Sequence, residues 1–234
     1  MPLISVAVRH VTKATPRTRH IQLGIADGVF TFVAGQAVMV WLQGSPLRKP
    51  YSIASAPWEV TKTGVLQLLA QVDDSSALDP HLELAAPGTL IDIDGPFGTF
   101  ALPAGAEHKR LLFIAGGTGI APLRSMLMDR LSRPAVPAIA LVYSARSPEE
   151  FAYRTELDAM AQAGRITAHF TATRADAGSW DGRRGRIQED LLRLALPSLD
   201  AHCLICGPPQ LVDDARGLLR QLGVNEASIL TDHY

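Results

Sequence analysis

The residues best placed to do chemistry form a glycine-rich turn, Gly116-Gly117-Thr118-Gly119-Ile120-Ala121-Pro122. The turn follows a continuous apolar run, Leu111 to Ala115, which is typical of a strand buried on both faces, and it precedes a helical pattern. Glycines let a backbone approach an anion, and the N-terminus of a helix offers free amides and the positive end of its dipole. Pro122 stands where the dinucleotide-binding fingerprint has its third glycine. A plain tight turn is the alternative, but this placement favours phosphate binding.

Two turns in the first half of the chain are the next candidates. Arg48-Lys49-Pro50-Tyr51-Ser52-Ile53-Ala54-Ser55 sets cations immediately before a strand that carries Tyr and Ser. Asp94-Gly95-Pro96-Phe97-Gly98-Thr99-Phe100 follows the end of another strand. Taken alone, each pattern is also typical of an ordinary turn beside a strand.

The two cysteines, Cys203 and Cys206, have the CxxC spacing of redox and zinc sites. They lie in an apolar strand pattern, however, and positions i and i+3 of a strand face opposite sides. We therefore expect neither a disulfide nor a metal site. Cys206 is predicted at the carboxyl end of a parallel strand, where α/β sheets bind ligands, and Cys203 is interpreted as a buried structural thiol.

Other catalytic patterns are missing from the sequence. The seven histidines form no i, i+4 pair, and there is no G-x-S-x-G elbow and no full Walker motif. Hydrolase and P-loop functions therefore have no support.

Short alternating runs up to about residue 100 predict a small antiparallel barrel. The expected strands are 5–8, 19–23, 37–42, 51–54, 65–72 and 90–93, with one short helix between Ser76 and Leu84. Glycines and a proline separate these runs, as in closely spaced turns.

After Pro103 the pattern changes to alternating strands and helices, which predicts a doubly wound α/β parallel sheet. Strands are expected at 111–115, 138–143, 166–171, 202–206 and 228–234, with helices after the glycine turn and at 148–163, 187–196 and 209–222. We expect two domains, 1–103 and 104–234.

Composition excludes several classes of protein. Lys plus Arg number 22 and Asp plus Glu 23, so the net charge of −1 argues against a nucleic-acid-coating protein. Two cysteines cannot supply a disulfide framework or the four thiolates of a plant-type iron–sulfur cluster. The first twelve residues lack the apolar core of a signal peptide, and the longest apolar stretch, 111–123, is too short to span a bilayer. We expect a cytoplasmic protein with no membrane partner.

The order of these motifs resembles the ferredoxin–NADP reductase family over almost the whole chain. A barrel with Lys-Pro-Tyr-Ser and Gly-Pro-Phe-Gly precedes a nucleotide-type sheet with Gly-Gly-Thr-Gly-Ile-Ala-Pro, Cys-Gly-Pro-Pro and a terminal aromatic residue. Each motif alone is weak evidence for the family, but four motifs in this order and in these domains make the resemblance specific.

The resemblance implies that the barrel binds FAD. Tyr51 would pack on the flavin and Ser52 would lie near its N5 atom, with Ile53 beside them. The family's Arg-x-Tyr-Ser arginine is Lys49 here and Arg48 precedes it, so either cation could meet the flavin pyrophosphate. Gly95 and Gly98 match the family's turn at the domain interface. The family's Gly-rich phosphate segment falls on Asp73–Asp79, which has no glycine and three acids.

In the second domain, the resemblance implies that Gly117, Thr118, Gly119 and Pro122 hold the pyrophosphate of a nicotinamide nucleotide. Cys206 would lie beside the nicotinamide, Tyr234 would stack on the flavin, and Asp232 would join Ser52 and Cys206 around the hydride path. A frayed C-terminus is the alternative for Tyr234.

Charge favours NADP over NAD. The strand before Ser144-Ala145-Arg146 ends without the acid that accepts ribose hydroxyls in NAD sites, and Arg174 and Arg184 follow later strands.

We therefore expect a monomeric oxidoreductase that passes a hydride from NADPH to FAD, then electrons to a separate ferredoxin, flavodoxin or oxygenase component. A reductase of free flavin and a non-catalytic nucleotide-binding regulatory module are the alternatives.

Overall fold

The computed structural model of the protein describes residues 3–26, 28–72, 82, 85–134, 137–176, 178 and 180–233. The chain divides into two compact units. Unit 1 contains Met1–Leu102 together with Arg124–Asp129, and unit 2 contains Pro103–Leu123 and Arg130–Tyr234. Across the described ranges, no helix has both the length and the apolar character needed to cross a membrane.

Unit 1 is built on an antiparallel sheet with the strand order β4-β3-β6-β1-β2-β5. The strands are β1 (Ile4–Thr15), β2 (Thr18–Gly24), β3 (Ala37–Leu42), β4 (Lys49–Ser52), β5 (Val65–Gln71) and β6 (Leu90–Phe97). The two edge strands meet just beyond β4, where Ile53 forms a bridge with Leu68 and the Ala54 amide donates to the Gln67 carbonyl at 2.8 Å. These contacts close the sheet and confirm the predicted small barrel.

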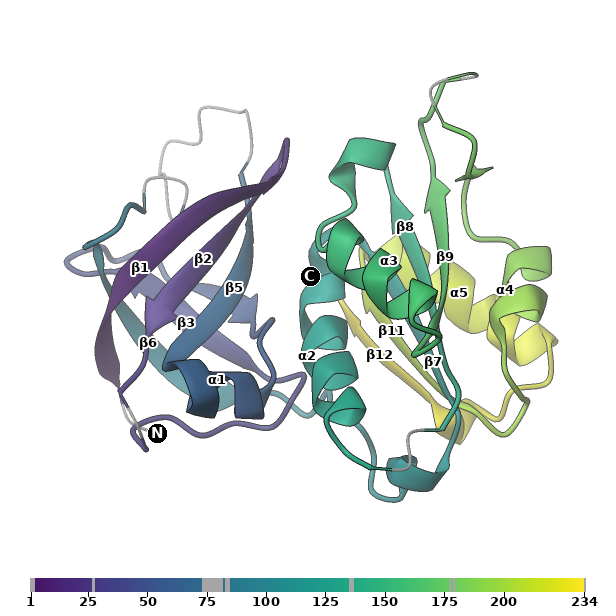
Figure 1. Cartoon of the computed structure of the whole chain (residues 1–234), viewed down its shortest axis with the longest axis horizontal. Helices are drawn as coiled ribbons and strands as arrows, with labels where there is room; N and C mark the ends of the chain where they lie inside the picture. Colours follow the sequence, from purple (N-terminus) through teal and green to yellow (C-terminus); the bar gives the residue numbers. More distant parts are fainter. Residues whose placement is uncertain are drawn as a thin grey trace. The chain divides into compact units, whose positions relative to one another are not determined.

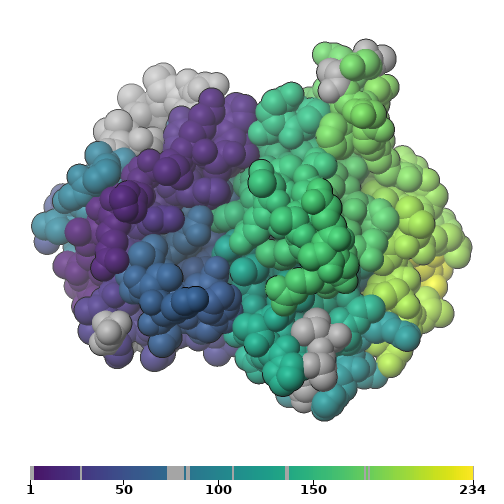
Figure 2. Space-filling model, in the orientation of Figure 1, coloured from purple at the N-terminus to yellow at the C-terminus, as the bar shows by residue number. Residues whose placement is uncertain are grey.

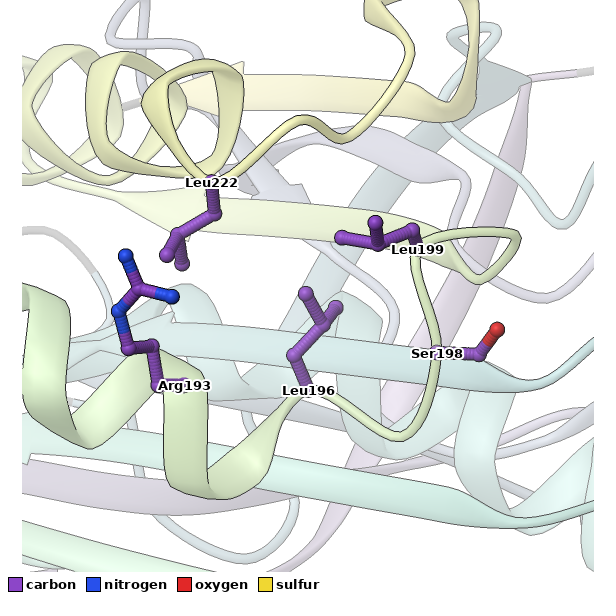
Figure 3. A pocket seen from close by; sticks show the side chains of 5 residues that line it. All are labelled: Arg193, Leu196, Ser198, Leu199 and Leu222. Carbon is purple, nitrogen blue, oxygen red and sulfur yellow. The ribbon is translucent and has the colours of Figure 1, made fainter.

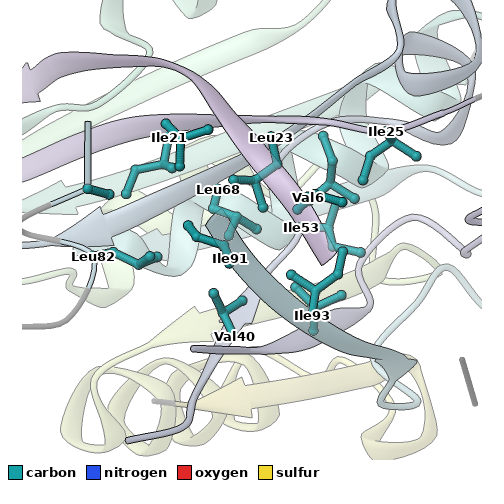
Figure 4. Close-up of a cluster of buried hydrophobic side chains, with 14 of the residues drawn as sticks. Val6, Ile21, Leu23, Ile25, Val40, Ile53, Leu68, Leu82, Ile91 and Ile93 are labelled. Carbon is teal, nitrogen blue, oxygen red and sulfur yellow. The ribbon is translucent and has the colours of Figure 1, made fainter. Parts of the chain in front are cut away.

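The barrel core is made of aliphatic side chains from β1, β2, β3, β5 and β6, together with Ile53 just beyond β4. Figure 4 shows Ile21, Leu23, Ile53, Leu68 and Ile91 gathered between the strands, and all five are fully buried. In β1, buried and exposed residues alternate near the start of the strand, because successive side chains point to opposite faces. The outer face of β1, purple in Figure 2, lies on the surface of the unit.

Unit 2 is a parallel sheet with the order β10-β9-β8-β7-β11-β12, covered by helices (Figure 1). The strands are β7 (Leu111–Gly116), β8 (Ile139–Ala145), β9 (Thr167–Ala172), β10 (Arg183–Arg184), β11 (His202–Gly207) and β12 (Ile229–His233). The helices are α2 (Ile120–Leu131), α3 (Arg154–Gln162), α4 (Glu189–Ala195) and α5 (Pro209–Gln221), with 3-10 turns at Ala106–His108, Gly117–Gly119, Pro148–Glu150 and Glu226–Ser228. Every residue of β7 and β8 is buried, as the apolar runs predicted. The doubly wound α/β prediction is confirmed.

The strand order places a topological switch point between β7 and β11. From β7 the chain moves outward through β8, β9 and β10, and it then returns to β11 on the other side of β7. Ligands of open α/β sheets bind beyond the carboxyl ends of the strands at such a point. The glycine turn follows β7 directly, and Cys206 is next to last in β11.

Several elements differ from the sequence predictions. The helix expected at 148–163 is a 3-10 turn, Pro148–Glu150, followed by α3, because the chain bends at Phe151–Tyr153 and buries the Phe151 ring. Tyr153 adopts φ 60° at this bend. The sequence analysis missed α1 (Pro57–Thr63) and the two-residue strand β10. The helix expected between Ser76 and Leu84 lies outside the described residues, apart from Leu82.

Candidate functional site

The glycine turn of unit 2 has backbone features that would suit an anion. Gly117 has φ 53°, Gly117 and Thr118 are half-exposed, and α2 begins at Ile120 with no acidic residue in its first turn. Pro122 is the third residue of α2, where a missing N–H costs no hydrogen bond. The Gly117 carbonyl accepts a hydrogen bond from the buried Tyr143 hydroxyl at 2.9 Å. This bond fixes the Gly117 carbonyl within the turn.

The other glycines of this turn allow the ends of β7 and β11 to approach each other. A Cβ at Gly119 would lie 2.2 Å from the Cys206 carbonyl oxygen, and one at Gly207 would lie 3.1 Å from the Gly116 backbone. A Cβ at Gly116 would lie 2.7 Å from Leu211. The predicted phosphate turn and Cys206 are therefore neighbours at the switch point.

Cys206 and Asp232 form a second pair at the same edge of the sheet. They are register partners in the parallel pair β11–β12, and Cys206 is buried while Asp232 is half-buried. Burial, together with the Asp232 carboxylate, raises the pKa of the Cys206 thiol. Cys206 is therefore a neutral thiol at neutral pH, suited to packing beside a ligand rather than to nucleophilic attack.

Cys203 belongs to the core instead. It is fully buried among the apolar side chains between the sheet and α4 and α5, and burial raises its pKa to about 12. Both cysteines are free. Within the described ranges, no three His, Cys, Asp or Glu side chains gather closely enough to hold a metal ion.

Two of the predicted arginines lie together beyond the carboxyl ends of β8 and β9. The Arg174 amide donates to the Arg146 carbonyl at 2.7 Å, so the two residues are neighbours on adjacent strands. Both side chains are exposed, and neither forms an ion pair with any residue of the described chain. Arg184 is also exposed, but its guanidinium donates to the Trp180 carbonyl at 2.6 Å.

An aromatic cluster lies between the glycine turn and the segment 180–184, which contains Arg183 and Arg184. Tyr143 packs edge-on against Phe151 with ring centroids 5.1 Å apart, and Phe151 contacts Trp180 at 5.9 Å. Trp180 donates from its indole nitrogen to the Arg183 carbonyl at 2.9 Å. The cluster thus connects Gly117, through Tyr143, with the segment that precedes β10.

In unit 1, the predicted flavin residues lie on the edge strand β4. Tyr51 pairs with Val38 and Lys49 pairs with Val40, so alternation places Lys49 and Tyr51 on one face and Ser52 on the other. Tyr51 is half-buried against the barrel core, and Ile53 is fully buried. Arg48 lies outside the strand with its guanidinium 4.4 Å from the centre of the Trp41 ring.

Gly95 and Gly98 lie one strand away from Ser52. Ala37 pairs with Ser52 on one side and with Phe97 on the other, and the β3–β6 register shifts between Ala37 and Met39. Gly95 adopts φ 140° and Gly98 φ 94°, conformations that favour glycine. This turn thus reaches the same part of the barrel as the Lys-Pro-Tyr-Ser strand.

Comparison with known proteins agrees with this arrangement. Residues 5–102 match the family described as the oxidoreductase FAD-binding domain, and residues 113–217 match the oxidoreductase NAD-binding domain. Ferredoxin–NADP reductase B of Sorangium cellulosum is 36% identical over 98% of this chain and 95% of its own length. The chain belongs to the ferredoxin–NADP reductase family. It is an NAD(P)H-dependent flavin oxidoreductase.

A second curated protein and a solved structure are also similar to this chain. NADH-cytochrome b5 reductase 1 of Eremothecium gossypii is 28% identical over 92% of this chain and 78% of its own length. The crystal structure of a ferredoxin NADP+ reductase from Neisseria gonorrhoeae with bound FAD and NADP superposes with a TM-score of 0.81. It is 22% identical, over 100% of this chain and 99% of that one.

The residues present fit the two cofactors of the ferredoxin–NADP reductase family. In unit 2, a turn free of acids and two arginines without an ion-pair partner among the described residues suit the phosphates of a nicotinamide nucleotide. In unit 1, Lys49 and Tyr51 share one face of β4, so a cation and an aromatic ring are offered to the same ligand. Tyr234 and the Asp73–Asp79 segment lie outside the described residues.

Two residues that contact the predicted site segments could not be singled out from the sequence. Tyr143 supports the glycine turn, and its signal was an aromatic residue in an otherwise aliphatic buried strand. Arg124 is buried in unit 1, and its signal was a charge among Leu123, Met126 and Leu127 in the apolar part of α2.

A further pocket lies at the opposite end of the parallel sheet. Figure 3 shows Arg193, Leu196, Ser198, Leu199 and Leu222 around it. These residues come from α4 and its following loop and from the end of α5, all of which lead into the amino ends of β11 and β12. The pocket is therefore separate from the switch point, where members of this fold class bind ligands.

Proposed function

We propose that this protein is an NADPH-dependent reductase that holds FAD and passes electrons to a separate acceptor protein. The observation that carries the choice of NADPH is the pair of exposed arginines, Arg146 and Arg174, which lie beyond β8 and β9 and form no ion pair with the residues that the structure describes. β8 ends in Ala145 and offers no carboxylate for ribose hydroxyls. Two guanidinium groups suit the 2′-phosphate that distinguishes NADP from NAD.

In this proposal, the residues of the chain bind and orient the cofactors. Gly117, Thr118 and Gly119 hold the nucleotide pyrophosphate through backbone amides, and Lys49 meets the flavin pyrophosphate from the face that it shares with Tyr51. The flavin supplies hydride acceptance and electron release, which no side chain of the chain can supply.

The remaining predicted residues would line the hydride path in this proposal. Ser52 would orient the flavin in unit 1, and Cys206 and Asp232 would orient the nicotinamide in unit 2. A neutral Cys206 thiol supports an orienting role, because only a thiolate would act as a nucleophile. We therefore expect moderate losses of rate, not complete loss, when any one of them is replaced.

The cofactor preference is tested by comparing kcat/KM with NADPH and NADH for three variants. Arg146→Gln and Arg174→Gln each remove one charge-assisted hydrogen bond, worth about 1.5–3 kcal/mol. We expect the lower value, because both arginine side chains are exposed and solvent weakens such contacts. We expect about a tenfold loss of kcat/KM with NADPH for each variant and little change with NADH. Arg193→Gln, which removes an exposed arginine of α4, is the matched control. A wild-type protein that prefers NADH would overturn the choice of nucleotide.

The acceptor is proposed to be a one-electron carrier such as a ferredoxin, a flavodoxin or an oxygenase component. Two cysteines within these 234 residues cannot ligate a plant-type iron–sulfur cluster, which needs four thiolates, so these residues offer no such cluster as an onward carrier. Anaerobic titration with NADPH, followed by each purified carrier, tests this step. Reoxidation of the flavin by none of the three carriers would contradict it.

Reduction of free flavin is the second candidate, because the segment that matches the family's flavin-phosphate loop carries Asp73, Asp74 and Asp79 and no glycine. The absorption spectrum of the purified protein separates the two functions. Bound FAD gives a yellow protein, whereas a colourless protein that reduces added flavin is a free-flavin reductase. A bound flavin that NADPH does not bleach without oxygen would indicate a non-catalytic module.

A further inference from the structure

A buried ion pair in unit 1 adjoins the predicted flavin strand. It joins Arg124, in the part of α2 that belongs to this unit, to Glu59 in α1. The Arg124 and Glu59 side chains are 7% and 20% exposed, so neither charge is freely solvated. The pair is bidentate, with both guanidinium nitrogens 3.1 Å from the two carboxylate oxygens.

The pair also binds the backbone that directly follows Ser52. The Arg124 Nη1 group donates to the Ala54 carbonyl at 2.8 Å, and the Ala56 amide donates to the Glu59 carboxylate at 2.7 Å. We call Arg124 and Glu59 the clamp. It therefore holds the backbone at two points, two and four residues after Ser52.

Neighbouring contacts fix the same short segment. The fully buried Ser125 hydroxyl donates to the Ser55 carbonyl at 2.7 Å, and the Ile53 amide donates to the Gln36 carbonyl at 2.9 Å. The chain from Ile53 to Ala56 is thus held by hydrogen bonds from barrel residues and from Arg124 and Ser125, all within unit 1.

An ion pair at this position acts differently from an apolar contact. Ion pairs with little solvent often stabilise a protein no better than well-packed apolar side chains, because desolvation offsets the attraction. Such ion pairs instead fix the orientation of their groups, because a bidentate guanidinium–carboxylate pair admits one arrangement of its atoms. An apolar contact could hold α2 near this segment but could not set the position of a carbonyl oxygen.

We propose that Arg124 and Glu59 are positioning residues that set the orientation of Tyr51 and Ser52 toward the flavin by fixing the backbone of residues 54–56. The proposal rests on the proposed function, in which β4 is the flavin strand. It adds a specific role for a pair that lies outside the cofactor-contacting motifs.

The test compares clamp variants as holoproteins. In Arg124→Met/Glu59→Gln no buried charge is left unpaired, so this double variant is expected to fold. Arg124→Lys keeps the charge and one donor nitrogen but cannot form the bidentate pair with Glu59. Lys109→Met, which breaks an exposed ion pair with Asp200, is the matched control. The measurements are the dissociation constant of FAD, the visible circular dichroism and midpoint potential of the flavin, and its rate of reduction by NADPH in a single turnover.

For the double variant we expect at least a tenfold slower reduction or at least a tenfold weaker FAD affinity, with altered flavin dichroism or potential. Arg124→Lys should recover part of each change, and Lys109→Met should match the wild type. A merely structural role would lower only the thermal midpoint. The proposal is overturned if FAD affinity and reduction rate in the double variant stay within twofold of wild type and the flavin signals are unchanged.

Tyr51→Ala separates this inference from the proposed function. Unchanged FAD binding in Tyr51→Ala would show that β4 is not the flavin strand, and both proposals would then fail. Weakened FAD binding in Tyr51→Ala, together with wild-type behaviour of the double clamp variant, would overturn the role of the clamp alone.

Discussion

Replacing Gly119 by alanine is predicted to damage both the stability of unit 2 and its binding of the nucleotide. The added Cβ would lie 2.2 Å from the Cys206 carbonyl oxygen, 2.4 Å from its carbonyl carbon and 2.7 Å from the Gly207 nitrogen. Carbon and oxygen atoms in contact normally stay about 3.3–3.6 Å apart. All three neighbours are backbone atoms of β11, so the glycine turn must move by about 1 Å.

The size of the effect follows from that displacement. Overpacking of a well-packed interior costs about 1–3 kcal/mol. For a chain of this size, each kcal/mol lowers the thermal midpoint by about 2–4 °C, so we expect a decrease of about 2 to 12 °C. A misplacement of about 1 Å near a reacting group can cost about a hundredfold in rate, so kcat/KM for NADPH should fall about ten- to a hundredfold.

The assay pairs thermal unfolding with steady-state kinetics. Gly217→Ala is the matched control, because a Cβ in that position of α5 has no neighbour within 4 Å. Alanine is the better helix former there, so the control should gain about 0.5–1 kcal/mol and keep its kcat/KM. If Gly119→Ala is as stable and active as the wild type, Gly119 is not needed for the approach of the two strand ends.

Three further outcomes are expected. Tyr143→Phe loses the hydrogen bond to the Gly117 carbonyl, worth about 0.5–1.5 kcal/mol, and should raise the KM for NADPH about two- to tenfold; an unchanged KM would show that this bond does not support the turn. Lys49→Met should weaken FAD binding at least about tenfold, and Arg48→Met, which removes the stack on Trp41, should do so far less; the reverse order in a flavin titration would assign the phosphate contact to Arg48. Because the pKa of Cys203 rises to about 12 on folding, the unfolded chain releases that proton first, near pH 9. Cys203 should therefore lower the free energy of unfolding by about 1.4 kcal/mol per pH unit between about pH 9 and 12, in addition to the effect of Cys206, and denaturant titrations of Cys203→Ala should lack the Cys203 contribution.

The local pattern of the sequence determined the type and order of the main elements. Continuous apolar runs such as 111–115 fit only strands covered on both faces, and the alternation in 65–72 fits a strand with one inner face. The glycine turn after such a run identified the nucleotide end of the sheet, because strand, turn and helix are consecutive in the chain. The order of four motifs was enough to indicate the ferredoxin–NADP reductase family.

Only the tertiary structure decided which of several equivalent residues meet. From the sequence, Arg48 and Lys49 were equally good candidates for the flavin pyrophosphate. The β3–β4 register places Lys49 on the same face as Tyr51, whereas the Arg48 guanidinium stacks on Trp41. The sequence also offered no reason to prefer one of the arginines near β8, β9 and β10, whereas within the described part of the fold Arg146 and Arg174 form no ion pair.

The contacts that could not be predicted from the sequence join residues that are distant in the chain. Arg124 reaches a carbonyl 70 residues away, and Tyr143 reaches one 26 residues away. Short periodicities report which side of an element is buried, but a hydrogen bond depends on the position and direction of two specific atoms. Those positions arise only when the elements pack, so the chemistry of single motifs could be predicted, whereas their supporting contacts could not.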